Sequence, residues 1–148
     1  MIEIVKGLLF SLLLIAAAIW DIKKQEIPNL IPLLLLLVGF IRIKPLNAVF
    51  GLILTGLPYF IAAVCVRRPD GFAIGGGDIK LMAACGFTLG VWGGVIQSIL
   101  SLTLALIAGI ILSAVEEKPL KKIKIPLAPC FCAGGIVTYT ALMIGAAF

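Results

Sequence analysis

The sequence predicts an all-α membrane protein of about six transmembrane helices, with the N- and C-termini both outside the cytoplasm. Three observations support this prediction. Hydrophobic residues make up 62% of the 148 residues, the mean hydropathy is +1.24, and charged residues gather in short stretches between long apolar runs. A soluble domain has about 45–50% apolar residues, so this composition indicates a chain solvated by lipid. Spanning segments must then be helices, because lipid offers the backbone no hydrogen-bond partners.

Each apolar run predicts one helix, except for a run too long for a single crossing. About 20 residues span a bilayer as a helix, and the apolar run from residue 79 to residue 115 is longer than that. Its glycine-rich stretch at residues 90–94 is the expected turn. The chain has no room for a second domain, so residues 1–148 are expected to form one domain. The predicted helices cover residues 2–20, 30–41, 46–66, 78–91, 95–115 and 126–148.

The basic residues predict the orientation of these helices. Cytoplasmic segments carry an excess of lysine and arginine. If the N-terminus lies outside the cytoplasm, nine of the 12 basic residues fall on the cytoplasmic side. The same orientation places Asp21 and Asp78 on the cytoplasmic face. The nine are Lys23, Lys24, Arg67, Arg68, Lys80, Lys118, Lys121, Lys122 and Lys124, and the other three are Lys6, Arg42 and Lys44.

The composition excludes several classes of function. With no histidine in the chain, histidine-dependent triads, metal sites and proton relays are excluded. The net charge of +5 comes from lysines divided among short loops, which is typical of membrane topology and not of nucleic-acid binding. The cysteines form no CxxC pair, so we expect no metal site, and no cofactor is implied. They are Cys65, Cys85, Cys130 and Cys132.

Two aspartates are the candidate catalytic residues. Asp78 follows Gly75, Gly76 and Gly77 and opens an apolar run whose only charged side chain is Lys80. Asp21 ends the first apolar run. A carboxylate at the edge of the hydrocarbon is costly and indicates function. Two carboxylates a few ångströms apart can hydrolyse a peptide, because like charges cannot both ionise and the pair then supplies one base and one acid.

The residues alone leave simpler interpretations open. Asp78 could merely cap the following helix, and Asp21 could mark an ordinary loop boundary. The three glycines could lie against an extended substrate, because they carry no side chains, or they could form a flexible loop. Lys80 could bind a substrate carboxylate or extend to the membrane surface. For Asn29, capping of the next helix is favoured over orienting its loop.

Three motifs in this chain resemble those of type IV prepilin peptidases. In the first, Asp21 is followed by a polar stretch and by Ile-Pro-Asn at residues 27–29. The second, Gly-Gly-Gly-Asp-Ile-Lys at residues 75–80, is similar to the GxGD signature followed by lysine. The third, Ile-Pro-Leu-Ala-Pro at residues 125–129, resembles the stretch before the family's last helix, with Ala128 in place of the usual glycine.

The resemblance implies a membrane aspartic endopeptidase that acts without metal. It would remove short basic leaders from prepilins or pseudopilins at the cytoplasmic face of the cell membrane, with Asp21 and Asp78 as the two catalytic carboxylates. Gly75, Gly76, Gly77 and Lys80 would contact the substrate. The chain has no CxxC motif. In this respect it resembles the short, peptidase-only enzymes of tight-adherence pili or the archaeal preflagellin peptidases, so N-methylation is not expected.

Three rival interpretations remain on the sequence alone. Presenilin-type proteases share the GxGD element but have a different first motif. A non-catalytic membrane subunit of a pilus or secretion assembly would need neither aspartate. A small ion-coupled transporter would use the aspartates to bind protons or cations, but such proteins often show internal repeats, and no repeat is evident here.

Overall fold

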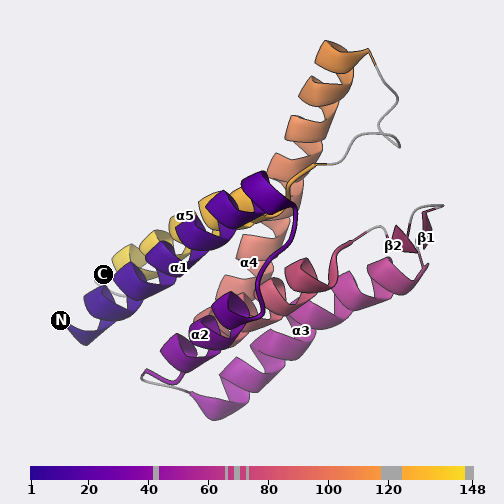
Figure 1. Cartoon of the computed structure of the whole chain (residues 1–148). Helices are drawn as coiled ribbons and strands as arrows, with labels where there is room; N and C mark the ends of the chain where they lie inside the picture. The colour runs from indigo at the N-terminus through magenta and orange to yellow at the C-terminus, as the bar shows by residue number, and fades with distance from the viewer. Residues whose placement is uncertain (42–43, 66, 69–70, 73, 118–124, 146–148) are drawn as a thin grey trace.

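The structure is a computed structural model that describes residues 1–41, 44–65, 67–68, 71–72, 74–117 and 125–145, and these are helical apart from loops and one pair of two-residue strands (Figure 1). Four helices, α1, α3, α4 and α5, are long and apolar enough to cross a membrane, and α2 is a shorter apolar helix. The all-α prediction is confirmed, whereas the six crossings and their orientation stay predictions. The elements are α1 (Ile2–Lys24), α2 (Leu30–Gly39), α3 (Pro45–Cys65), β1 (Arg67–Arg68), β2 (Gly71–Phe72), α4 (Gly76–Glu116) and α5 (Ala128–Gly145).

The long helix α4 reverses direction at Gly90. This residue has φ 75° and ψ −173°, a conformation that glycine adopts far more readily than other residues. A Cβ atom on Gly94 would lie 3.0 Å from the Cα atom of Gly86, although eight residues of a continuous helix span about 12 Å. Helix α4 therefore consists of two segments, residues 76–89 and 91–116, and the break falls in the glycine-rich stretch where the sequence predicts a turn.

Glycines allow α3 to pack directly on the first segment of α4. A Cβ atom on Gly51 would collide with the carbonyl oxygen of Gly86, and one on Gly86 would collide with the Thr55 hydroxyl. The buried Thr55 hydroxyl oxygen lies 3.0 Å from the carbonyl oxygen of Met82 and 2.9 Å from that of Gly51. Close approach of small residues and hydrogen bonds between helices are the usual means of holding helices together in lipid.

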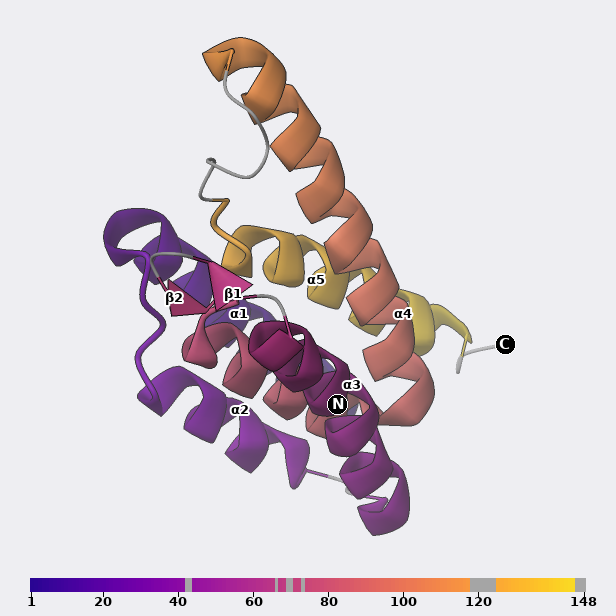
Figure 2. The same ribbon diagram turned by 90° about the vertical axis from the view of Figure 1, so that its right-hand side faces the viewer.

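Helix α5 runs antiparallel to α1 and crosses the second segment of α4 (Figure 2). The Phe10 ring stacks on Tyr139 with 5.6 Å between centroids, and the Tyr139 hydroxyl donates to the backbone oxygen of Glu3 at 2.8 Å. The C-terminal end of α1 and the N-terminal ends of α4 and α5 consequently gather at one end of the bundle, while α1 begins and α5 ends at the other end, at the left in Figure 1.

Helix ends differ from the sequence prediction at the site of interest. Helix α1 continues to Lys24, so Asp21 lies in its last turn and not in a loop. Gln25 ends α1 in the left-handed conformation, with φ 53°, and its N–H donates to the Asp21 carbonyl oxygen at 2.8 Å. Lysines in a last helical turn are favourable, which explains the extension. Helices α4 and α5 begin at Gly76 and Ala128, not at the predicted residues 78 and 126. The predicted end of the last helix, residues 146–148, lies outside the described residues.

We predict that Gly86→Val will disrupt the fold, because the added side chain would meet Thr55 and the backbone of Gly51. Overpacking of this kind typically costs about 1–3 kcal/mol or more. Thermal unfolding of the protein in detergent should show a clear loss of stability. Gly145→Val is the control and should unfold like the parent, because a Cβ atom at this position would meet no side chain or neighbouring element of the described residues within 4 Å. Equal stability of the two variants would contradict the close α3–α4 packing.

Candidate active site

Asp21 is a buried carboxylate anchored by the last helix. Its side chain is 6% exposed, and its Oδ2 atom accepts a hydrogen bond from the backbone N–H of Ala128 at 3.0 Å. Ala128 is the first residue of α5, where helical N–H groups lack intrahelical partners and the helix dipole favours a negative charge. The third sequence motif thus supplies a donor to the first, a contact that the sequence did not predict.

Asp78 lies in the first turn of α4 with one carboxyl oxygen directed into the protein. Its Oδ1 atom is buried and has no hydrogen-bond partner among the described residues. Its other oxygen, Oδ2, would lie 3.2 Å from a Cβ atom on Gly75. The backbone N–H of Asp78 donates to the Gly75 carbonyl oxygen at 3.1 Å. A buried carboxyl oxygen without a protein partner is costly, and such atoms commonly receive water or a ligand.

The fold brings the two aspartates together. Asp21 comes from the end of α1 and Asp78 from the start of α4, and their carboxyl groups are close enough for their charges to interact. Charges interact strongly in a site of low dielectric, so two neighbouring carboxyl groups are unlike two isolated ones. The arrangement can therefore provide one carboxylate that activates water and one carboxylic acid that donates a hydrogen bond.

Asn29 and Lys80 form a second link between the first two motifs. The Lys80 ammonium donates to the Asn29 side-chain oxygen at 2.8 Å, and both residues are exposed. Asn29 precedes α2 but makes no side-chain capping hydrogen bond. Asn29 thus occupies the predicted N-cap position of α2, but its side-chain oxygen accepts from the Lys80 ammonium and makes no capping hydrogen bond to the helix. The bond holds Lys80 at the start of α4, two residues beyond Asp78.

The three glycines before Asp78 have three different surroundings. A Cβ atom on Gly76 would meet nothing within 4 Å, so this residue faces open space. A Cβ atom on Gly77 would lie 2.9 Å from the Cβ atom of Ile27, so this glycine lets α4 approach the segment after α1. Gly75 precedes the helix and borders the Asp78 carboxyl group. Of the three glycines, Gly75 and Gly76 are exposed and Gly77 packs on another segment, so the glycine backbone open to a substrate is shortened to Gly75 and Gly76.

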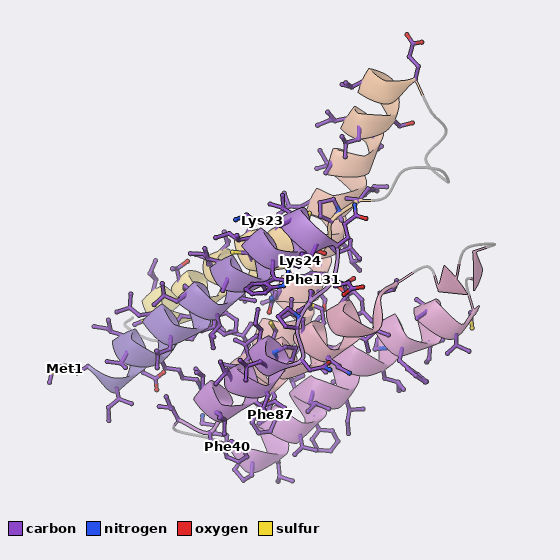
Figure 3. The ribbon with its side chains drawn as sticks, viewed as in Figure 1. Met1, Lys23, Lys24, Phe40, Phe87 and Phe131 are labelled. Carbon is purple, nitrogen blue, oxygen red and sulfur yellow. The ribbon has the colours of Figure 1, made fainter. Side chains whose placement is uncertain are left out.

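The surroundings of the site are basic and apolar. Lys23 and Lys24 are exposed on α1 near Asp21, and the Lys24 ammonium lies 5.1 Å from the centroid of the Trp20 ring. Figure 3 shows these two lysines well away from Phe40 and Phe87, whose rings pack 5.3 Å apart near the reversal of α4. The described residues contain no group of three side chains able to hold a metal ion.

A cavity of about 590 Å³ lies at the opposite end of the bundle and does not include either aspartate. Its lining includes Glu3, Lys6, Lys44 and Tyr139, and Glu3 is the one carboxylate among the residues that line it. A single carboxylate beside lysines does not provide the two-carboxylate chemistry described above. The chemistry of the side chains therefore favours Asp21 and Asp78 as the candidate active site over this cavity.

Comparison with known proteins agrees with this geometry. The sequence profile of the Type IV leader peptidase family matches residues 8–114. The chain is 30% identical over 140 residues to the Prepilin leader peptidase/N-methyltransferase of Bacillus subtilis (strain 168), an alignment that covers 93% of this chain and 56% of that protein. The chain thus spans about half the length of this curated relative. No solved structure matches the chain significantly. Since the profile covers most of the chain and includes both aspartates, the chain belongs to the type IV leader peptidase family.

Proposed function

We propose that this protein is a membrane-embedded aspartic endopeptidase that removes the short basic leader of type IV prepilins or prepilin-like proteins at the cytoplasmic face of the cell membrane. The observation that carries the proposal is the pairing of Asp21 and Asp78, from different helices, at one end of an apolar bundle in a chain of this family. The proposal concerns the peptidase activity alone and includes no methyl transfer. The proposal also includes the predicted topology, in which the chain crosses the membrane six times and both termini lie outside the cytoplasm.

The proposed mechanism uses the different surroundings of the two carboxyl groups. Asp21 accepts the Ala128 N–H at the start of α5, which favours the negatively charged carboxylate, so its other oxygen binds and deprotonates the attacking water. Asp78 has a buried oxygen without a partner among the described residues, and burial of this kind favours the neutral acid, so Asp78 donates the hydrogen bond to the scissile carbonyl. Water attacks the carbonyl carbon, the carbonyl oxygen gains a proton, and the C–N bond breaks as the amine nitrogen is protonated.

The substrate contacts are proposed for the glycines and for Lys80. The open backbone at Gly76 leaves room for an extended substrate strand, and Gly75 borders the Asp78 carboxyl group without a side chain of its own. Gly77, which packs on Ile27, fixes the position of this strip. Lys80, held by Asn29, would bind a carboxylate or carbonyl oxygen of the substrate beside the scissile bond.

Asp21→Asn and Asp78→Asn should each abolish leader removal, because each removes one of the two groups that transfer protons. Such groups typically contribute about 10²–10⁴-fold to the rate. The measurement is co-expression with a prepilin from the same genome, followed by the size shift on leader loss. Glu26→Gln, which changes an exposed acid in the same region, should leave cleavage intact. Normal cleavage by either aspartate variant at parental expression would disprove the proposed mechanism.

Ala128→Pro should lower kcat, since proline lacks the N–H that donates to Asp21. Proline is tolerated in a first helical turn. A hydrogen bond to a charged group contributes about 1.5–3 kcal/mol, which corresponds to roughly a 10- to 100-fold loss of rate. Ala128→Gly retains the N–H and is the matched control. Thermal unfolding of both variants separates loss of the donor from loss of folding, and an unchanged kcat in folded Ala128→Pro would show that the donor is dispensable.

Asn29→Ala and Lys80→Met should weaken substrate binding by similar factors, and the double variant should be no worse than either single one. The reason is that each change breaks the same hydrogen bond, so the effects are not additive. KM for a prepilin in detergent is the quantity to compare among the four proteins. Additive effects on KM would mean that the two residues act separately and that Asn29 does not position Lys80.

A further inference from the structure

Polar side-chain atoms without protein partners are buried inside the helix bundle. Six such atoms occur among the described residues. One is Asp78 Oδ1 at the candidate active site. Four others come from α3 and from the second segment of α4, and we call them the interior polar cluster. The cluster consists of the Tyr59 hydroxyl, Gln97 Oε1, Ser98 Oγ and Ser101 Oγ, and the sixth atom, Thr138 Oγ1, lies one turn along α5 from Gly134.

Tyr59 connects the interior polar cluster to the candidate active site. Its side chain is 4% exposed, and its hydroxyl lies within electrostatic range of the Asp78 carboxyl group and close to the Ser98 hydroxyl. Neither hydroxyl reaches a hydrogen-bonding geometry with another described residue. The Tyr59 ring packs edge-on against Phe131 of α5, with 5.7 Å between centroids, so the orientation of the ring is fixed by packing and not by its hydroxyl.

Small residues of α5 make room for the other members of the cluster. Gln97 is fully buried, and its Nε2 atom donates to the Phe131 carbonyl oxygen at 3.1 Å, which leaves Oε1 without a partner. A Cβ atom on Gly135 would lie 2.9 Å from Gln97 Nε2, and one on Gly134 would collide with the Ser101 hydroxyl. The two glycines thus let polar side chains enter the interface between α4 and α5.

The serine hydroxyl groups of the cluster differ from those of four threonines in the same helices or in α5. Thr55, Thr88, Thr103 and Thr140 each donate to the carbonyl oxygen four residues earlier in their helix, the usual way to satisfy a hydroxyl in an apolar helix. Ser98 and Ser101 make no such bond. An unsatisfied buried polar group costs about 1–3 kcal/mol, so several together require partners. Buried polar groups that lack protein partners are commonly satisfied by ordered water, which makes about three hydrogen bonds.

We propose that the interior polar cluster is a water-binding site that extends to Asp78 Oδ1 and supplies the hydrolytic water from inside the bundle. The second part rests on the proposed peptidase function, whereas the presence of the water does not. A substrate lying over Gly76 would cover the aspartates from the outer side. Water could still reach them from inside the bundle, past Tyr59 and Ser98. Tyr59 and Ser98 are then positioning residues, because they act on the attacking water and do not touch the scissile bond.

The presence of water can be tested without any substrate. In radiolytic hydroxyl-radical footprinting, radicals form at bound water and oxidise the nearest side chains. Phe131 and Phe10 form a matched pair, since both are 0% exposed and chemically identical, but Phe131 contacts Tyr59. We expect Phe131 to be oxidised several times faster than Phe10, and Ser98→Ala to reduce this difference. Equal, slow oxidation of both phenylalanines in the parent protein would overturn the proposal.

The catalytic part of the proposal can be tested with conservative variants. Tyr59→Phe and Ser98→Ala should each lower kcat for prepilin cleavage about two- to tenfold, the size of a lost neutral hydrogen bond, with KM unchanged. Tyr139→Phe is the matched control, because its hydroxyl bonds Glu3 at the other end of the bundle. An unchanged kcat in both variants would overturn the supply role even if footprinting detects the water. If the parent cleaves no prepilin, the proposed function fails, and footprinting alone still decides the water site.

Discussion

The reversal of α4 at Gly90 is the constraint on which the rest of the structure depends. Backbone contact between Gly51 of α3 and Gly86 of α4 fixes the first segment of α4, and the positive φ of Gly90 sends the second segment back along the bundle. The returning segment brings Gln97 and Ser98 against the interior and gives α5 its packing partner. Without this reversal, α5 could not begin beside Asp21, and the site would lack its anchoring donor.

Contacts between motifs, more than the motifs themselves, define the candidate site. Each of the three motifs provides a partner to another: Ala128 donates to Asp21, and Lys80 donates to Asn29. These bonds lie at one end of the bundle, where they join segments that are distant in sequence. The aspartates therefore do not rely on a single rigid loop, and their spacing reflects how three helix ends pack.

The sequence was sufficient for the apolar helices and for the break near Gly90, because each of these leaves a local signal, whereas the catalytic role of the two aspartates stays a prediction. It failed where a distant partner decides the outcome. Asp21 accepts a hydrogen bond from Ala128, which lies 107 positions further along the chain, and Asn29 accepts one from Lys80 of α4 in place of capping α2 with its side chain. Gly77 packs on Ile27 for the same reason. No local pattern encodes the identity of a neighbour in space.

The bond between Asp21 and Ala128 has a consequence for the biosynthesis of the protein. The two residues are separated by 107 positions. The Ala128 N–H that donates to Asp21 of α1 is therefore synthesised only when the ribosome reaches α5. During translation, the earlier helices can enter the membrane and pack while the site is still incomplete. A partly synthesised chain therefore carries both aspartates before the Ala128 donor to Asp21 is in place, and this hydrogen bond forms only when α5 has been inserted.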